Sequence, residues 1–94
     1  MNEYLVELYV SKTNCAAIAA GAELLGRAAD ELTAEGTPVR LVRTIFVPED
    51  ETCFVLVEAP TPEAVRETAQ RAALPLERVV EATIDLANPI ERKL

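Results

Sequence analysis

The chain has 94 residues, enough for one domain, and half of them are hydrophobic although only 4% are aromatic. Its net charge of −7 would be repelled by phosphate backbones and anionic lipids, so we expect no nucleic-acid or membrane role. Histidine is absent, which removes the commonest general base and the commonest transition-metal ligand. No signal peptide or membrane-spanning run is evident, so we expect a cytoplasmic location.

The first two predicted elements are a strand and a long helix. Residues 3–10 alternate between apolar and polar side chains in the manner of a half-buried strand. Residues 15–35 carry apolar side chains at helical spacing, and Gly36 is expected at the left-handed position that follows a helix. Gly21 and Gly26 each cost about 1 kcal/mol relative to Ala inside a helix, and close approach to the sheet would explain them.

The middle of the chain predicts a hairpin followed by a second helix. Residues 39–47 and 52–59 are rich in β-branched side chains, and the acidic, proline-containing segment 48–51 suits a solvated turn between them. The second helix should begin with Thr61 as its N-cap and Pro62 at its first helical position.

The last predicted element is a strand over residues 78–86, which alternates again. The order β-α-β-β-α-β predicts an α+β fold, the ferredoxin-like sandwich, with an antiparallel sheet of order 4-1-3-2 and both helices on one face. We assign residues 1–86 to this domain and residues 87–94 to a C-terminal tail. The two cysteines, Cys15 and Cys53, have no metal-site or redox-motif spacing, and we interpret them as small buried side chains.

The sheet face without helices, called the open face below, is predicted to mix bulky apolar side chains with charges. Alternation, with Val42 and Phe46 assigned to the core, gives its members as Leu5, Glu7, Tyr9, Leu41, Arg43, Ile45, Val47, Thr52, Phe54, Leu56, Glu58, Val79, Glu81, Thr83 and Asp85. So much apolar surface implies a cover, and a second copy of the same sheet is the simplest one. We therefore expect a homodimer through this face, forming a dimeric α+β barrel.

Three carboxylates are predicted to converge on the open face, because their strands are neighbours. Glu7, Glu58 and Glu81 would hold a divalent cation there, or Glu7 would act as an acid or base beside Tyr9 and Arg43. The wider predicted ligand-binding set is Glu7, Tyr9, Arg43, Phe54, Glu58 and Glu81. The alternative is a purely structural role, in which Arg43 forms an ion pair with one glutamate and the other two reach the edge of the sheet or of the dimer.

Two other candidate sites are weaker. The acidic segment 49–51 has too few ligands at defined spacing for a hard-metal loop, and we interpret it as a solvated turn. Cys53 has no histidine to activate it as a nucleophile, and the alternation of side chains along its strand places it on the helix-facing side of the sheet.

Three stretches of the sequence resemble one family. They are YLVELYV near the start, GTPVRLVRTIFVPEDETCFVLVEAPTPEAVRE in the middle and LPLERVVEA near the end. The middle is the most specific, through V-P-E-D-x-T-C-F at residues 47–54 and E-A-P at 58–60. The chain resembles a family of small bacterial domains of unknown function, described loosely as nickel-binding or nickel-responsive. The resemblance implies a ferredoxin-like fold, usually dimeric, with possible nickel as cofactor and with matched polar positions at Glu7, Tyr9, Arg43, Glu58 and Glu81.

Three functions remain open from the sequence. The first is a non-catalytic homodimeric domain that holds a small molecule or a divalent cation at or near the open face. The second is a small barrel enzyme of the cyclase, isomerase or cofactor-free oxygenase type, acting on an apolar metabolite through Glu7, Tyr9 and Arg43. The third is a protein-interaction module.

Overall fold

The computed structural model describes residues 1–14, 16–74 and 78–83. Within them the chain forms four strands and two helices, with a short 3₁₀ turn in the hairpin. These elements are β1 (Asn2–Tyr9), α1 (Ala16–Ala34), β2 (Arg40–Val47), η1 (Pro48–Asp50), β3 (Thr52–Ala59), α2 (Pro62–Arg71) and β4 (Arg78–Ala82). The predicted order β-α-β-β-α-β is confirmed.

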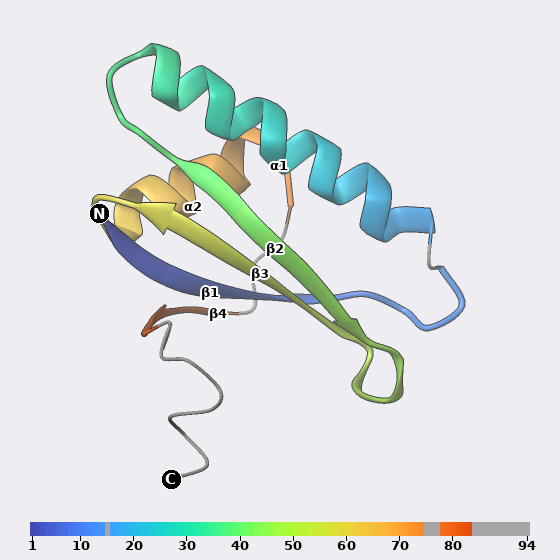
Figure 1. Ribbon diagram of the computed structural model, residues 1–94. Helices are drawn as coiled ribbons and strands as arrows, with labels where there is room; N and C mark the ends of the chain where they lie inside the picture. The colour runs from blue at the N-terminus through green and yellow to red at the C-terminus, as the bar shows by residue number, and fades with distance from the viewer. Residues whose placement is uncertain (15, 75–77, 84–94) are drawn as a thin grey trace, which may run out of the picture.

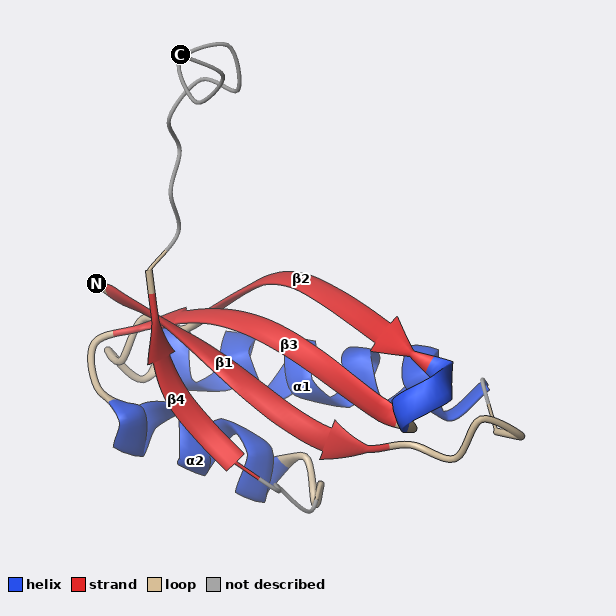
Figure 2. Cartoon of the chain, turned by 90° about the horizontal axis from the view of Figure 1, so that it is seen from below, coloured by secondary structure: helices blue, strands red, loops and turns tan. Residues whose placement is uncertain are grey.

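The strands form one antiparallel sheet of order β2-β3-β1-β4, which is the predicted order 4-1-3-2 read from its other edge. Both helices lie on one face of this sheet (Figure 1), and no described helix covers the other face, which Figure 2 shows from below. The α+β sandwich expected from the sequence is therefore present.

The core lies between the sheet and the helices. Its largest fully buried apolar side chains are valines of β1, β3 and α2, namely Val6, Val55, Val57 and Val65. Every second residue of β1 and β3 points toward the helices, and these side chains form the sheet's contribution to the core. The core contains few aromatic side chains, so it is thin.

The predicted residues at the end of α1 and at the start of α2 are confirmed. Gly36 follows α1 at φ +102°, and the backbone N–H of Thr37 donates to the carbonyl of Leu32 at 2.9 Å. Thr61 caps α2 by accepting a hydrogen bond from the N–H of Ala64 at 3.2 Å. Glycine is favoured at the first of these positions because a side chain there strains the backbone.

The predicted face assignment of the fourth strand is wrong. Tyr4 pairs with Glu81 and Val6 pairs with Val79, so Glu81 and Val79 share the helix-facing side of the sheet with two buried residues of β1. β4 lies at the edge of the sheet. Of its helix-facing side chains, Val79 packs against the core. Glu81 remains exposed at the edge of the sheet.

The second strand contains a β-bulge, which corrects two further assignments. Leu41 pairs with Val57 and Arg43 pairs with Leu56, so Val42 is the extra residue. Leu41 therefore faces the helices and packs against the core, whereas Val42 is 36% exposed. Arg43, Ile45 and Val47 return to the open face as predicted, because the bulge restores their alternation.

Several predictions concern parts of the chain outside the described residues. These are Cys15, the strand residues 84–86 with Asp85, and the tail 87–94. Among the residues that are described, neither helix combines the length and apolar character needed to cross a membrane.

Candidate functional site

The open face, as the structure has it, carries equal numbers of opposite charges around an apolar centre. Its described residues follow from the strand register: Glu3, Leu5, Glu7 and Tyr9 of β1; Arg40, Arg43, Ile45 and Val47 of β2; Thr52, Phe54, Leu56 and Glu58 of β3; Arg78, Val80 and Ala82 of β4. Three glutamates and three arginines give this face no net charge, although the whole chain carries −7.

The three carboxylates expected to converge do not meet. Glu58 pairs with Glu3, four residues along β1 from Glu7, so Glu7 and Glu58 are separated by about 13 Å at roughly 3.3 Å per residue. Glu81 lies on the opposite side of the sheet. Two of the open-face carboxylates have arginine partners instead: Glu58 contacts Arg40 at 2.7 Å, and Glu7 lies 3.5 Å from Arg78. The hydrogen bond from Arg40 to Glu58 raises the pKa of the guanidinium further.

The remaining predicted site residues are spread over the open face. Glu7 and Tyr9 are neighbours on β1 and line a shallow depression with Thr52. Phe54 lies between Glu7 and Ile45 across three strands. Arg43 lies two strands from β1, about 10 Å away at the usual strand spacing, so it does not join Glu7 and Tyr9 in one site.

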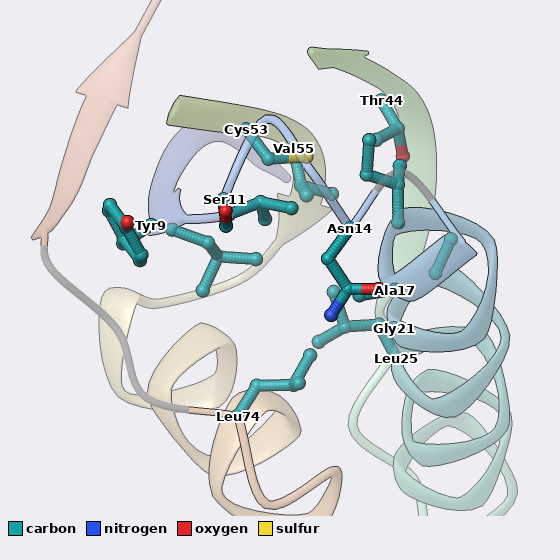
Figure 3. Close-up of a pocket in the computed structure, with 14 residues that line it drawn as sticks. Tyr9, Ser11, Asn14, Ala17, Gly21, Leu25, Thr44, Cys53, Val55 and Leu74 are labelled. Carbon is teal, nitrogen blue, oxygen red and sulfur yellow. The ribbon is translucent and has the colours of Figure 1, made fainter. Parts of the chain in front are cut away.

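A cavity of about 300 Å³ lies on the other side of the sheet, under the N-terminal half of α1. We call it the helix-side cavity (Figure 3). The residues that line it are Leu8, Tyr9, Val10, Ser11, Asn14, Ala17, Ile18, Gly21, Ala22, Leu25, Thr44, Cys53, Val55 and Leu74. Its floor comes from the sheet, one wall comes from α1, and Leu74 reaches toward α1 from the segment after α2 (Figure 3).

The cavity exists because the two helices differ in length and in side-chain volume. α1 has 19 residues but α2 has only 10, so this end of the sheet lies beyond the last turn of α2. The part of α1 above it presents Ala17, Gly21 and Ala22, which fill little space. Opposite them, Thr44 and Cys53 are small as well.

The segment that follows β1 forms the polar side of the cavity and is fixed by Glu51. The N–H of Val10 donates to the carbonyl of Glu51 at 2.9 Å, and the N–H of Lys12 donates to its carboxylate at 2.9 Å. Glu51 itself adopts a left-handed conformation, with φ 48°. The predicted solvated turn therefore has a structural role, because it positions Ser11.

Cys53 lies at the base of the cavity with 3% of its surface exposed. Burial raises the pKa of its thiol, so the nucleophilic thiolate is disfavoured. The interpretation of Cys53 as a small buried side chain is confirmed.

Sequence reasoning missed the helix-side cavity as a site. Only Tyr9, among the predicted site residues, lines it. The signal that could have revealed it is the run of mostly small residues AAIAAGA at positions 16–22, before the leucines of the same helix. Helical periodicity alone assigns such a run to the core.

Comparison with known proteins places the chain in a family. The sequence pattern of the family described as "Nickel responsive protein SCO4226-like" matches residues 19–82, more than half of the chain. The chain belongs to this family. Among solved structures, a crystal structure of SCO4226 from Streptomyces coelicolor A3(2) is similar, with a TM-score of 0.69 and 17% identity over 88% of this chain and 98% of that chain. At this identity the likeness establishes the shared fold. No curated protein sequence matches the chain significantly.

The described residues do not fit the nickel that the name of the SCO4226-like family suggests. The sequence has no histidine to supply an imidazole ligand. The described ranges hold no cluster of three or more acidic or cysteine side chains placed to ligate one metal ion. Of the open-face carboxylates, Glu7 and Glu58 are separated along the sheet, and each contacts an arginine, as described above. We therefore assign no described residue a role in binding nickel.

Proposed function

We propose that this chain is a homodimeric, non-catalytic domain that binds a small molecule, and that each protomer holds the molecule in its helix-side cavity. The observation that carries the proposal is the cavity itself. Its volume falls at the lower end of the range for small-molecule pockets, and a few polar side chains sit in a mainly apolar lining, as such pockets require. This moves the ligand from the open face, where the sequence suggested it, to the opposite side of the sheet.

A second copy of the chain is the proposed cover of the open face. Apolar side chains such as Ile45, 49% exposed, would otherwise remain in water. The balanced glutamates and arginines make the face self-complementary, because a twofold axis can place acidic positions of one protomer against basic positions of its partner. A chain with a large net negative charge gains from meeting its copy through a neutral surface.

Native mass spectrometry of the protein as purified tests this function. We expect a dimer that carries up to two copies of an organic adduct, released on unfolding. A dimer without adduct, together with no stabilising compound in a thermal-shift screen of small metabolites, would refute the binding function. A monomer at micromolar concentration would refute the assembly.

A further inference from the structure

We infer that the helix-side cavity selects a neutral amphiphile, a short apolar chain with one uncharged hydrogen-bonding head, and that Gly21 preserves the space for its apolar part. This inference rests on the proposed binding function and names the class of ligand and the residue that sets its size.

The charge of the ligand follows from the lining. Every described residue that lines the cavity is uncharged. A carboxylate or ammonium head would therefore lose its hydration with no opposite charge on the lining to replace it, which is strongly unfavourable. Ser11, Asn14 and Thr44 supply hydroxyl and amide groups, which suit an alcohol, aldehyde, ketone or amide head.

The position of the head follows from where these polar groups lie. Ser11 and Asn14 both belong to the segment between β1 and α1, and Ser11 exchanges a hydrogen bond of 2.9 Å with Thr13. Asn14 projects into the space between α1 and Leu74 (Figure 3). The apolar part would then extend away from this segment, along Gly21 and Leu74.

Gly21 is the least expected residue in the wall. Glycine weakens a helix interior relative to alanine, so a helical glycine usually marks a close contact. No such contact exists here, because a Cβ at Gly21 would meet Leu74 only at 3.8 and 3.9 Å, an ordinary distance. What a side chain at Gly21 would occupy is the cavity. The close approach to the sheet that the sequence suggested is therefore not the reason for this glycine.

Gly26 provides a matched control in the same helix. A Cβ there would meet Leu41 at 4.0 Å, again without a clash, and Gly26 does not line the cavity. Substitution of either glycine by alanine or leucine improves helix propensity by a similar amount. Only substitutions at Gly21 would reduce the space for a ligand.

The size of the cavity sets the probe. An apolar cavity of about 150 Å³ is enough to hold benzene, so a cavity of about 300 Å³ accepts a medium-chain molecule. We would titrate the full chain with 1-octanol, sodium octanoate and octylammonium chloride, which share one apolar chain and differ in head charge. Backbone amide NMR shifts would report both the affinity and the residues affected.

We expect 1-octanol to shift the amides of Ser11, Gly21 and Cys53, and to bind about tenfold or more tightly than either charged probe. Gly21→Ala should weaken this binding about tenfold, by analogy with one extra methyl group in an apolar pocket, and Gly21→Leu should abolish it. Gly26→Ala and Gly26→Leu should leave the affinity within about twofold.

Four results would overturn the inference, and the last two separate it from the proposed function. Equal binding of octanoate would refute the neutral head. Octanol binding that survives Gly21→Leu would refute the position of the apolar part. A native adduct on a protein that binds no octanol would refute this ligand class but leave the binding function intact. Absence of both adduct and probe binding would refute the inference and the proposed function together.

Discussion

At the scale of single residues, the two helices end with the same hydrogen bonds but with different residues. After α1, Gly36 takes the left-handed position and Thr37 closes the turn. After α2, Ala73 takes it at φ 57°, and the N–H of Leu74 donates to the carbonyl of Ala69 at 3.0 Å. Alanine is strained there, because its Cβ crowds the following carbonyl. The strained turn is also what directs Leu74 toward the cavity.

This difference predicts opposite effects of two reciprocal substitutions. Ala73→Gly should stabilise the protein, and Gly36→Ala should destabilise it, each by about 1 kcal/mol, because a side chain in the left-handed region is disfavoured by roughly that amount. Equilibrium unfolding in urea would measure both free energies. If both substitutions changed the free energy of unfolding in the same direction, the two turns would not be equivalent.

At the scale of secondary-structure elements, Arg71 joins the ends of the two helices. It donates two hydrogen bonds to Glu35 of the turn after α1, both at 2.8 Å, and another to Glu67 at 2.7 Å, while Glu31 lies 3.5 Å away. The hydrogen bond from Arg71 lowers the pKa of Glu35 below its ordinary value of 4.5. The hydrogen bonds to Glu35 and Glu67 in turn raise the pKa of the Arg71 guanidinium.

The lowered pKa predicts how this contact depends on pH. A carboxyl whose pKa is lower in the folded state stabilises the fold above its ordinary pKa, and the stabilisation is lost as pH falls through the folded value. Arg71→Gln should therefore lower the urea midpoint at pH 7, and its difference from the wild type should shrink below about pH 4.5. Arg66→Gln, at an exposed arginine of the same helix, controls for the change in net charge. An Arg71→Gln effect that is independent of pH would contradict the role of Glu35.

The sequence predicted the elements well because each carries its own local signals. Thr61 and Pro62 identify the start of α2, Gly36 identifies the end of α1, and β3 spans the predicted residues. Strand faces were predicted less well, since Val79 and Val80 are both apolar and alternation alone cannot choose between them. The bulge at Val42 also has no distinctive residue.

The candidate site was mostly missed for a different reason. The predicted carboxylates, Glu7, Glu58 and Glu81, depend on the register of β4 and on distances along β1. The cavity depends on the volumes of side chains from distant segments and on where α2 stops, neither of which appears in a local pattern. Tyr9 belongs both to the predicted open-face site and to the lining of the cavity, because it is the last residue of β1.

At the scale of the whole molecule, the open face predicts the effect of a charge on assembly. Ile45→Glu would bury an extra carboxylate between the proposed protomers, so the dimer dissociation constant should rise at least about tenfold, or 1.4 kcal/mol. Leu24→Glu is the matched control, because Leu24 is 43% exposed on α1, away from the open face. Analytical ultracentrifugation measures both. Equal dissociation constants for the two variants would place the contact elsewhere.

The bulge in β2 has a further consequence for how copies of the chain meet. β2 is one border of the described sheet, and a regular border strand offers free backbone groups on which strands from other molecules can add without limit. The irregularity at Val42 interrupts that row, and the neighbouring Arg40 and Arg43 add like charges along it. Unlimited strand addition through this border is therefore disfavoured, which agrees with the proposed closed pair through the open face.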